Sequence, residues 1–370
     1  MKSIPIYQPF LNGNEKKYVN NCLDANWISS RGDYIPTFEK AFIEYVGAKY
    51  ATSVSNGTVA LHLALMALNL GPGDEVIVPT LTYIASVNTI RQTGATPIFV
   101  DSLASTWQIN TQDIVSKITA KTKAIMAVHL YGHPCDMDQL AAICNKFDLL
   151  LIEDCAQAFG TRYKGKHVGT FGDVATFSFF GNKTITTGEG GMVVSKSVQL
   201  HNRCCLLKSQ AMSPTKAYWH EELGFNYRMT NICAAIGLAQ LEQAETILKR
   251  KAELATFYHQ KLNHLDVEFQ IEAQDITHSH WMCSMLVRTE KERDGLRHHL
   301  STHGIETRPL FYPAHMMPHF KEHTSYPVAE NLSQRGLNLP SWPGLTDVEL
   351  ATIATTVSQY FSQGAKLGAQ

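Results

Sequence analysis

Apolar and polar residues form two distinct patterns between about Val54 and Ser195. Short runs rich in β-branched residues have the length of buried strands, and they are Glu75–Pro79, Thr96–Asp101, Ala124–Leu130, Leu149–Asp154 and Val174–Phe180. Helical stretches separate several of these runs, among them Val59–Leu68 and Met137–Phe147. Continuous apolar strands that alternate with helices predict an α/β protein, with a mainly parallel sheet covered on both faces.

The pattern changes after Ser195. The segment Glu242–Leu262 predicts one long helix, and shorter strand and helix signals follow it. We therefore expect two domains. The first is a large domain of residues 1–240, which includes the N-terminal segment, and the second is a smaller C-terminal domain of residues 241–370.

The composition is that of an ordinary globular protein. The 370 residues carry a formal net charge of -1, and 44% of them are hydrophobic, so nothing favours binding to nucleic acid or to an anionic membrane. The N-terminus has no apolar run typical of a secretory signal, and no stretch approaches the roughly 18 apolar residues that span a bilayer. The eight cysteines show no CxxC pair, so we expect reduced thiols and a cytoplasmic location.

Candidate binding side chains follow the predicted strands. In chain order they are Gly57, Thr58, Tyr83, Asp154, Gln157 and Lys183. In an open parallel sheet, ligands bind at the carboxyl ends of the strands. We therefore expect these groups to converge on one edge of the sheet.

Each of these residue types suits one part of a phosphorylated aromatic cofactor. Gly57 and Thr58 open a helix, whose free N–H groups and positive dipole suit a phosphate, although threonine is also an ordinary helix cap. Asp154 could keep a pyridinium protonated, although a capping or ion-paired aspartate is the commoner case. Tyr83 could stack on a planar ring, or it could pack in the core.

Lys183 is the single residue that indicates a chemistry most specifically. It stands in a Gly-Asn-Lys turn directly after an apolar strand, and not on a helix surface, where most lysines are merely solvated. A lysine beside a bound aldehyde can form an imine with it. The ordinary alternative is an exposed loop lysine.

Together these elements resemble the DegT/StrS family of nucleotide-sugar aminotransferases over essentially the whole chain. The segments that carry the resemblance are Trp27–Gly32, Ser55–Ala60, Gly71–Ile84, Gly94–Asp101, Glu153–Gly160, Phe177–Val193 and Gly224–Ala235. The most specific element is Asp154-x-x-Gln157 followed by Ser178-x-x-x-x-Lys183. The resemblance implies the fold-type I class of pyridoxal-phosphate aminotransferases, with a mainly parallel mixed sheet in the large domain and a smaller C-terminal α/β domain.

The resemblance also implies roles for the cofactor-facing residues. Lys183 would hold pyridoxal 5'-phosphate covalently and move protons, and Asp154 would pair with the ring nitrogen. Gln157 would contact the ring hydroxyl, and Tyr83 would cover the ring face.

The phosphate of that cofactor would be held by two subunits. Gly57, Thr58 and Ser178 would bind it from one subunit. Asn226 would reach it from the partner subunit, with Arg228 close by. The resemblance therefore implies a homodimer with shared active sites.

Within the family, the chain is most similar to the branch that aminates the 4-keto group of GDP-4-keto-6-deoxymannose, with L-glutamate as the amino donor. Amination of dTDP-4-keto-6-deoxyglucose is the nearest alternative. The sugar-facing segments are expected to include Gly304–His315, and the candidate substrate contacts are Ser29, Arg308 and His315. A family branch that removes a hydroxyl has histidine where this chain has Lys183, so that activity is disfavoured.

Three other functions remain as alternatives. His315, His319 and His323 have a spacing that could serve a metal-dependent hydrolase, but Pro318 interrupts the helix that would align them. A non-catalytic, cofactor-binding regulator is disfavoured by the intact Lys183. A nicotinamide dehydrogenase is disfavoured because no G-x-G-x-x-G follows the early strands. We therefore expect an enzyme that uses no metal.

Overall fold

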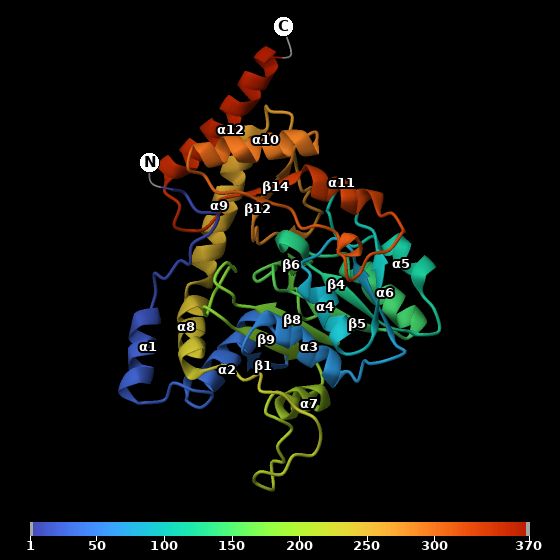
Figure 1. Ribbon diagram of the computed structural model, residues 1–370. Helices are drawn as coiled ribbons and strands as arrows, with labels where there is room; N and C mark the ends of the chain where they lie inside the picture. The colour runs from blue at the N-terminus through green and yellow to red at the C-terminus, as the bar shows by residue number, and fades with distance from the viewer. Residues whose placement is uncertain (1–2, 368–370) are drawn as a thin grey trace.

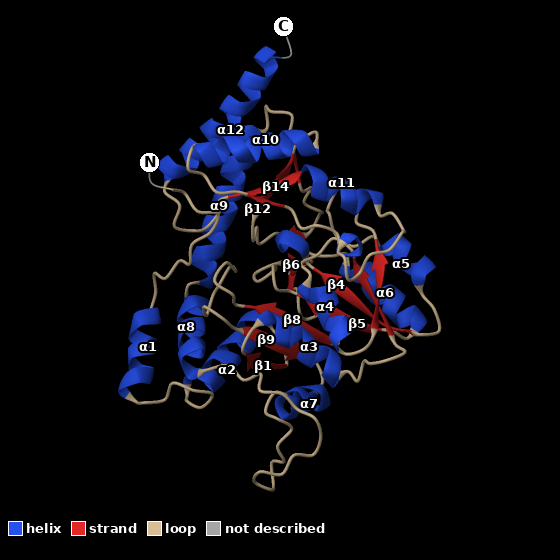
Figure 2. Ribbon diagram, viewed as in Figure 1, coloured by secondary structure: helices blue, strands red, loops and turns tan. Residues whose placement is uncertain are grey.

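A computed structural model describes residues 3–367 of the chain. At its centre lies a seven-stranded sheet in the order β1-β9-β8-β5-β4-β2-β3, with helices packed around it (Figure 2). Its strands are β1 (Tyr50–Val54), β2 (Glu75–Pro79), β3 (Thr96–Val100), β4 (Thr122–Val128), β5 (Leu150–Asp154), β8 (Val174–Ser178) and β9 (Gly191–Ser195).

Strand direction places most of the strand ends together. Strand β9 pairs antiparallel with both β1 and β8, whereas the pairs that join β8, β5, β4, β2 and β3 are parallel. All strands of this sheet except β9 therefore point the same way. Their carboxyl ends share one edge, which is where ligands bind in such sheets.

Helices cover both faces of this sheet, as the continuous apolar strands require. In β2, Val76 and Val78 face one side, which is covered by α3 (Gly57–Ala67), α4 (Ala85–Gln92) and α7 (Val198–Leu207). Ile77 faces the other side with its neighbours in β4 and β5. The helices on that side are α2 (Tyr34–Val46), α5 (Thr111–Lys117), α6 (Met137–Phe147) and α8 (Asn231–Glu242), and α1 (Glu15–Asp24) packs on α8.

The C-terminal part has a sheet and a core of its own, above the large sheet in Figure 1. Its strands, in sheet order, are β10 (Glu268–Phe269), β12 (Cys283–Leu286), β14 (Gly336–Leu339) and β13 (Arg308–Pro309). Its helices are α9 (Ala244–Leu262), α10 (Glu290–Thr302), α11 (Pro327–Arg335) and α12 (Asp347–Leu367). Ile4 packs in the same core and forms a bridge with Ile305, so the first described residues contact this part.

A small third sheet ties the two parts together. Strand β11 (Ile276–Thr277) follows α9 in the chain but pairs with β6 (Arg162–Tyr163), which also pairs with β7 (Lys166–His167). The segment after β11 then contacts the turn after β4, where Ser279 N–H donates a 3.2 Å bond to the carbonyl of Gly132, before the chain enters β12.

The predicted fold class is confirmed, and so are all five predicted strands. Strand β2 and helix α6 have the predicted bounds, and the other predicted strands differ by one or two residues at one or both ends. The predicted helix Glu242–Leu262 begins at Ala244, because Gln243 separates it from α8. This break lies close to the expected domain boundary near residue 240, and the two domains themselves remain a prediction. Within residues 3–367, no helix combines the length and apolar character needed to cross a membrane.

Candidate active site

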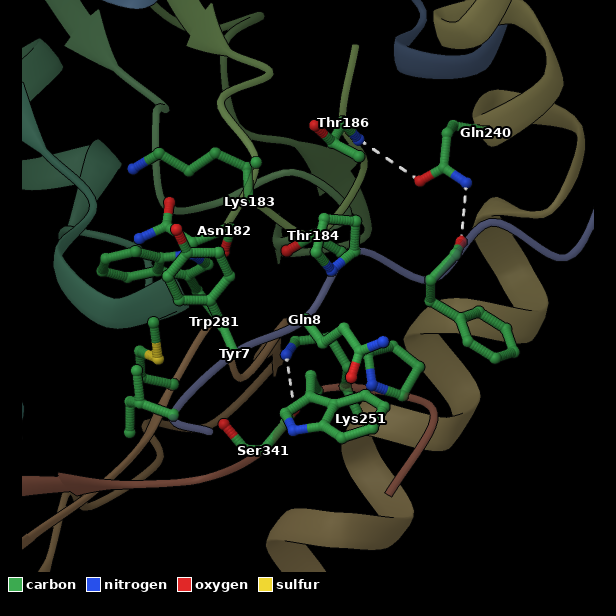
Figure 3. A pocket seen from close by; sticks show the side chains of 17 residues that line it. Tyr7, Gln8, Asn182, Lys183, Thr184, Thr186, Gln240, Lys251, Trp281 and Ser341 are labelled. Carbon is green, nitrogen blue, oxygen red and sulfur yellow. Dashed lines mark hydrogen bonds between the residues drawn. The ribbon is translucent and has the colours of Figure 1, made fainter. Parts of the chain in front are cut away.

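Lys183 lies in a tight turn just past the end of β8. Its backbone N–H donates a 2.9 Å hydrogen bond to the carbonyl of Phe180. The side chain is half-buried, and its Nζ lies 4.2 Å from the centre of the Trp281 ring (Figure 3). Burial lowers the pKa of the Lys183 ammonium to about 8, although the negative charge of Asp154 opposes this effect. A lysine with such a pKa has enough neutral amine near neutral pH to attack an aldehyde.

Asp154 ends β5 on the sheet face that carries α4. Its side chain is buried, with 4% exposed. Oδ2 accepts a 2.7 Å hydrogen bond from the Ser86 hydroxyl of α4, and Oδ1 accepts a 3.0 Å bond from the backbone N–H of Ala156. These two bonds fix the orientation of the carboxylate. Ser86 was not among the residues predicted from the sequence.

Gln157 follows Asp154 and is equally buried. Its Oε1 accepts a 2.8 Å hydrogen bond from the backbone N–H of Tyr131, which follows β4. Because that N–H can only donate, the amide orientation is determined, and the NH₂ group of Gln157 remains available as a donor. A donor at this place suits the hydroxyl oxygen of a bound ring.

A cradle for an anion lies at the start of α3. The side chain of Asn56 caps the helix by accepting a 3.0 Å bond from Val59 N–H, which leaves the N–H groups of Gly57 and Thr58 as open donors. The Ser178 side chain lies against Gly57, since a Cβ on Gly57 would be 2.5 Å from the Ser178 Cβ. Two backbone donors, a hydroxyl and the helix dipole thus meet at one point, which favours a phosphate.

An aromatic wall, formed by Tyr83, Phe311, Tyr131 and Trp281, borders the turn of Lys183. Tyr83 is 53% exposed, and its ring centre lies 5.6 Å from that of Phe311. Phe311 stacks on Tyr131 at 5.3 Å, and Tyr131 stacks on Trp281 at 6.0 Å. Sequence reasoning found Tyr83 but missed the other three residues, because no local spacing connects residues that lie in distant parts of the chain.

Asn226 and Arg228 lie on an extended segment beside the end of β1. Arg228 forms a bridge with Val54, and Tyr227 accepts a 2.8 Å bond from Ser55 N–H. Tyr227 points inward, where its hydroxyl contacts His62 of α3 at 3.1 Å. Asn226 and Arg228 are exposed on the opposite side, and Arg228 donates a 3.2 Å bond to Asn226 Oδ1.

The three candidate substrate residues have different surroundings. Ser29 is exposed near the start of α8, where its carbonyl accepts a 2.6 Å bond from Asn231 N–H. Arg308 is exposed and lies 5.4 Å from the ring of Tyr7, which lines a pocket with Lys183. His315 is buried in the short helix η2 (Ala314–Met316).

Both ring nitrogens of His315 have partners. Nδ1 contacts the Thr80 hydroxyl at 2.7 Å, and Nε2 contacts Glu330 at 3.3 Å. His319 contacts Asn88 instead, at 3.3 Å. These two histidines thus have separate partners, and contact between His315 and a substrate remains a prediction.

A buried group behind Asp154 has the spacing of a metal site. His129, Glu153 and Cys155 bring their ligand atoms within 4.8 Å of one another, and all three are buried. Glu153 already accepts hydrogen bonds from three backbone N–H groups, at 2.6–2.8 Å, and pairs with His129 at 3.1 Å. Burial alone would raise the pKa of Glu153, but His129 and these N–H groups hold it below its usual value. We interpret the group as a structural ion pair that joins strand ends.

Comparison with known sequences gives a match over nearly the full length. Residues 9–358 match the DegT/DnrJ/EryC1/StrS aminotransferase family. The chain is 58% identical to the GDP-perosamine synthase of Escherichia coli O157:H7, over 98% of this chain and 100% of that protein. It is 52% identical to the GDP-perosamine synthase of Vibrio cholerae, over 97% and 99% of the two chains.

Comparison with solved structures gives the same fold. The PLP form of Spr1654, a putative sugar aminotransferase from Streptococcus pneumoniae, superposes with a TM-score of 0.93 at 27% identity. The match covers 98% of this chain and 99% of that one.

Proposed function

Because this chain belongs to the DegT/DnrJ/EryC1/StrS aminotransferase family, we propose that it transfers the amino group of L-glutamate to the 4-keto group of GDP-4-keto-6-deoxymannose and so forms GDP-perosamine. The observation that carries the class of reaction is the placement of Lys183 beside Asp154 at the edge of the sheet. The substrate rests on the full-length identity of 58% and 52% to two GDP-perosamine synthases.

The residues at this edge fit pyridoxal 5'-phosphate. The open N–H groups of Gly57 and Thr58, together with the Ser178 hydroxyl, match a phosphate. The buried carboxylate of Asp154 matches a protonated ring nitrogen, since an adjacent anion favours the charged form. When bound, this cofactor supplies an aldehyde that carries the amino group and a ring that withdraws electrons.

The protein side chains have separate roles in the reaction. Lys183 would hold the aldehyde of the bound cofactor, and its free amine would accept and return the proton at the carbon that carries the nitrogen. Its lowered pKa, about 8, suits an amine that must both accept and give a proton near neutral pH. Ser86 and the backbone of Ala156 hold Asp154 in place, and Tyr83 offers an exposed ring face for stacking.

We propose that the active enzyme is a homodimer and that Asn226 binds the cofactor phosphate of the partner subunit. Asn226 and Arg228 point away from α3 of their own subunit, which supports this arrangement. The segment between α7 and α8 projects from the body in Figure 1 and exposes large apolar side chains, with Tyr218 91% and Leu223 80% exposed. Exposed apolar groups of this kind are typical of an interface.

We propose a reducing compartment, the cytoplasm, as the place of action. All eight cysteines are free thiols, and six of them are buried. Free thiols are typical of proteins from a reducing compartment.

Two experiments test the proposed function. Protein loaded with pyridoxal phosphate and glutamate should aminate GDP-4-keto-6-deoxymannose with a higher kcat/KM than dTDP-4-keto-6-deoxyglucose. The opposite preference would make the GDP assignment wrong and leave the class of reaction intact. Borohydride reduction of the loaded protein should leave the mass of the cofactor on Lys183, and finding it on another lysine would contradict the site.

A further inference from the structure

Trp281 touches Lys183 from a distant part of the chain. The Lys183 Nζ lies 4.2 Å from the centre of the Trp281 ring, within the range of a cation–π contact. The indole N–H donates a 2.8 Å hydrogen bond to the carbonyl of Asn182, the residue before Lys183. Trp281 is 5% exposed, so both contacts are shielded from water (Figure 3).

The ring of Trp281 has little freedom to move. Its plane is stacked on Tyr131, with 6.0 Å between ring centres and 11° between planes, and it also stacks on Phe311. The Tyr131 hydroxyl accepts a 3.0 Å bond from the backbone N–H of Phe311. Trp281 is therefore one side of a fixed aromatic wall, and Lys183 is the mobile partner in the contact.

The strap, residues 276–281, carries Trp281 to this position. Ile276 and Thr277 pair with β6, and Ser279 N–H donates a 3.2 Å bond to the carbonyl of Gly132. The strap passes so close to Gly132 that a Cβ there would lie 2.6 Å from Ser279 Oγ and 3.0 Å from Trp281 N. Gly132 also has a φ of +99°, which favours glycine.

We propose that Trp281 is a positioning residue for Lys183: its ring face holds the Lys183 amine in the part of the reaction in which the lysine is not bonded to the cofactor. This inference rests on the proposed function. An aminotransferase lysine must leave the aldehyde, stay close to the reacting carbon, and return. A long, flexible side chain loses entropy on every return, and a ring face that attracts its charged form reduces that loss.

The charge of Lys183 provides a direct readout of this contact. The titratable groups around it are Asp154 at the end of β5, Tyr131 after β4, and Tyr7 and Lys251 in the same pocket. Asp154 favours the ammonium form of Lys183, whereas burial disfavours it. A cation–π contact adds to the effect of Asp154, so its loss should lower the pKa of Lys183.

The experiment measures that pKa in the full-length protein before the cofactor is added. Trace acetylation with acetic anhydride between pH 6.5 and 10, followed by mass spectrometry of the Lys183 peptide, gives the fraction of neutral amine. The exposed Lys40 serves as the internal reference. Trp281→Leu should lower the pKa of Lys183 by about 0.5 to 1, and Trp281→Phe should lower it by less. An unchanged or raised pKa in Trp281→Leu would overturn the proposal.

A matched tryptophan separates the contact from general packing. Trp342 lines the same pocket, and its indole N–H also donates to a carbonyl, that of Pro5 at 3.2 Å. Trp342→Leu should leave the pKa of Lys183 as in the wild type, and an equal fall would contradict a specific role for Trp281. If Trp281→Leu does not fold, tryptophan fluorinated on the ring replaces residue 281, because fluorine weakens the ring's attraction for a cation with little change of shape.

A second variant tests the strap without touching Trp281. Gly132→Ala should displace the strap and lower the pKa of Lys183 in the same direction. Gly73→Ala is the matched control, because its φ is +95° and nothing lies within 4 Å of the added Cβ. Equal pKa values in the Gly132 and Gly73 variants would overturn the role of the strap.

Kinetics on the loaded enzyme complete the test. Trp281→Leu should reduce kcat by about tenfold while KM for both substrates changes little, and Trp281→Phe should recover most of the loss. A rise in KM without a fall in kcat would contradict a positioning role. The labelling measurement needs neither substrate nor cofactor, so it remains decisive for the contact even if the proposed substrate is wrong.

Discussion

The hydroxyl of Ser86 donates a 2.7 Å hydrogen bond to Oδ2 of Asp154, and both residues are buried. The bond joins helix α4 to the end of strand β5, and a second bond from Ala156 N–H holds the other carboxylate oxygen. Because both oxygens are held, the orientation of the charge is set before any cofactor binds. Such preorganisation is a major source of catalytic power.

This pair gives the first prediction. Asp154→Asn keeps the shape and removes the charge, so the chemical step with glutamate should slow by at least about a hundredfold. Ser86→Ala keeps the charge of Asp154 but removes one hydrogen bond that orients its carboxylate. The rate of the chemical step should fall by about tenfold, which corresponds to the loss of one hydrogen bond to a charged group. Single-turnover absorbance kinetics with glutamate measure both.

Thr82→Val is the control for this prediction. The Thr82 hydroxyl lies 3.1 Å from the Ser86 hydroxyl, so it reaches Asp154 only through Ser86 in this series of hydrogen bonds. This variant should slow the reaction less than Ser86→Ala. Near-normal single-turnover rates in Asp154→Asn would rule out its assigned role.

The second prediction concerns the phosphate cradle. In Gly57→Ala the new Cβ would lie 2.5 Å from the Ser178 Cβ and 2.8 Å from its hydroxyl, so Ser178 must move away from the cradle. The dissociation constant of pyridoxal phosphate, measured by absorbance titration, should rise by about tenfold or more. In Gly181→Ala the nearest atom is 3.9 Å away, on Tyr7, so this control should bind the cofactor almost as the wild type does. Equal affinities in the two variants would contradict the assigned cradle.

The third prediction tests whether two subunits share each site. Lys183→Ala and Asn226→Ala should each be inactive as a homodimer. In a mixed dimer with shared sites, one site carries both changes and the other carries neither. Random remixing of equal amounts should therefore restore about a quarter of the wild-type activity, because half of the dimers are mixed and each has one intact site. If no activity returns although subunit exchange is demonstrated, Asn226 acts within its own subunit.

The fourth prediction concerns acid stability. Burial lowers the pKa of His133 to about 4, whereas an unfolded histidine titrates near 6.5. Below pH 6.5 the unfolded chain therefore takes up a proton that the folded chain does not. This group should reduce the free energy of unfolding by about 1.4 kcal/mol per pH unit until the pH approaches 4, and it should contribute nothing above pH 6.5.

Partly buried neighbours add to this effect. Burial lowers the pKa of His280 to about 3 and that of His278 well below its usual value. Urea unfolding at pH 7.5, 6.5 and 5.5 should thus show a steep loss of stability in the acid range. The free energy of unfolding of His133→Gln should depend less steeply on pH than that of the wild type. The free energy of unfolding of His323→Gln, a change at an exposed histidine, should depend on pH as steeply as that of the wild type. Equal slopes for the wild type and His133→Gln would contradict the neutral, buried state.

The sequence by itself determined the large sheet and the residues at the centre of the candidate site. Runs such as Glu75–Pro79 predict strands, because burial on both faces leaves their central positions apolar. In a parallel sheet the strand ends share one edge, so chain order alone brought Asp154, Gln157 and Lys183 together. Each of these residues ends its strand or follows it within a few positions, and a signal of that kind is local.

Only the tertiary structure decided the rest. Trp281 contacts Lys183, which lies 98 residues earlier in the chain, and it also donates a hydrogen bond to the carbonyl of Asn182. Its approach depends on a strap that fits against Gly132, and no periodicity in the sequence encodes a fit between segments so far apart. Ser86 lies on a helix face whose rotation is set by packing on the sheet, and that rotation, rather than its position in the chain, directs its hydroxyl at Asp154. The local sequence pattern therefore determines which strands end at the candidate site. Long-range packing determines which side chains contact its charged groups, Asp154 and Lys183.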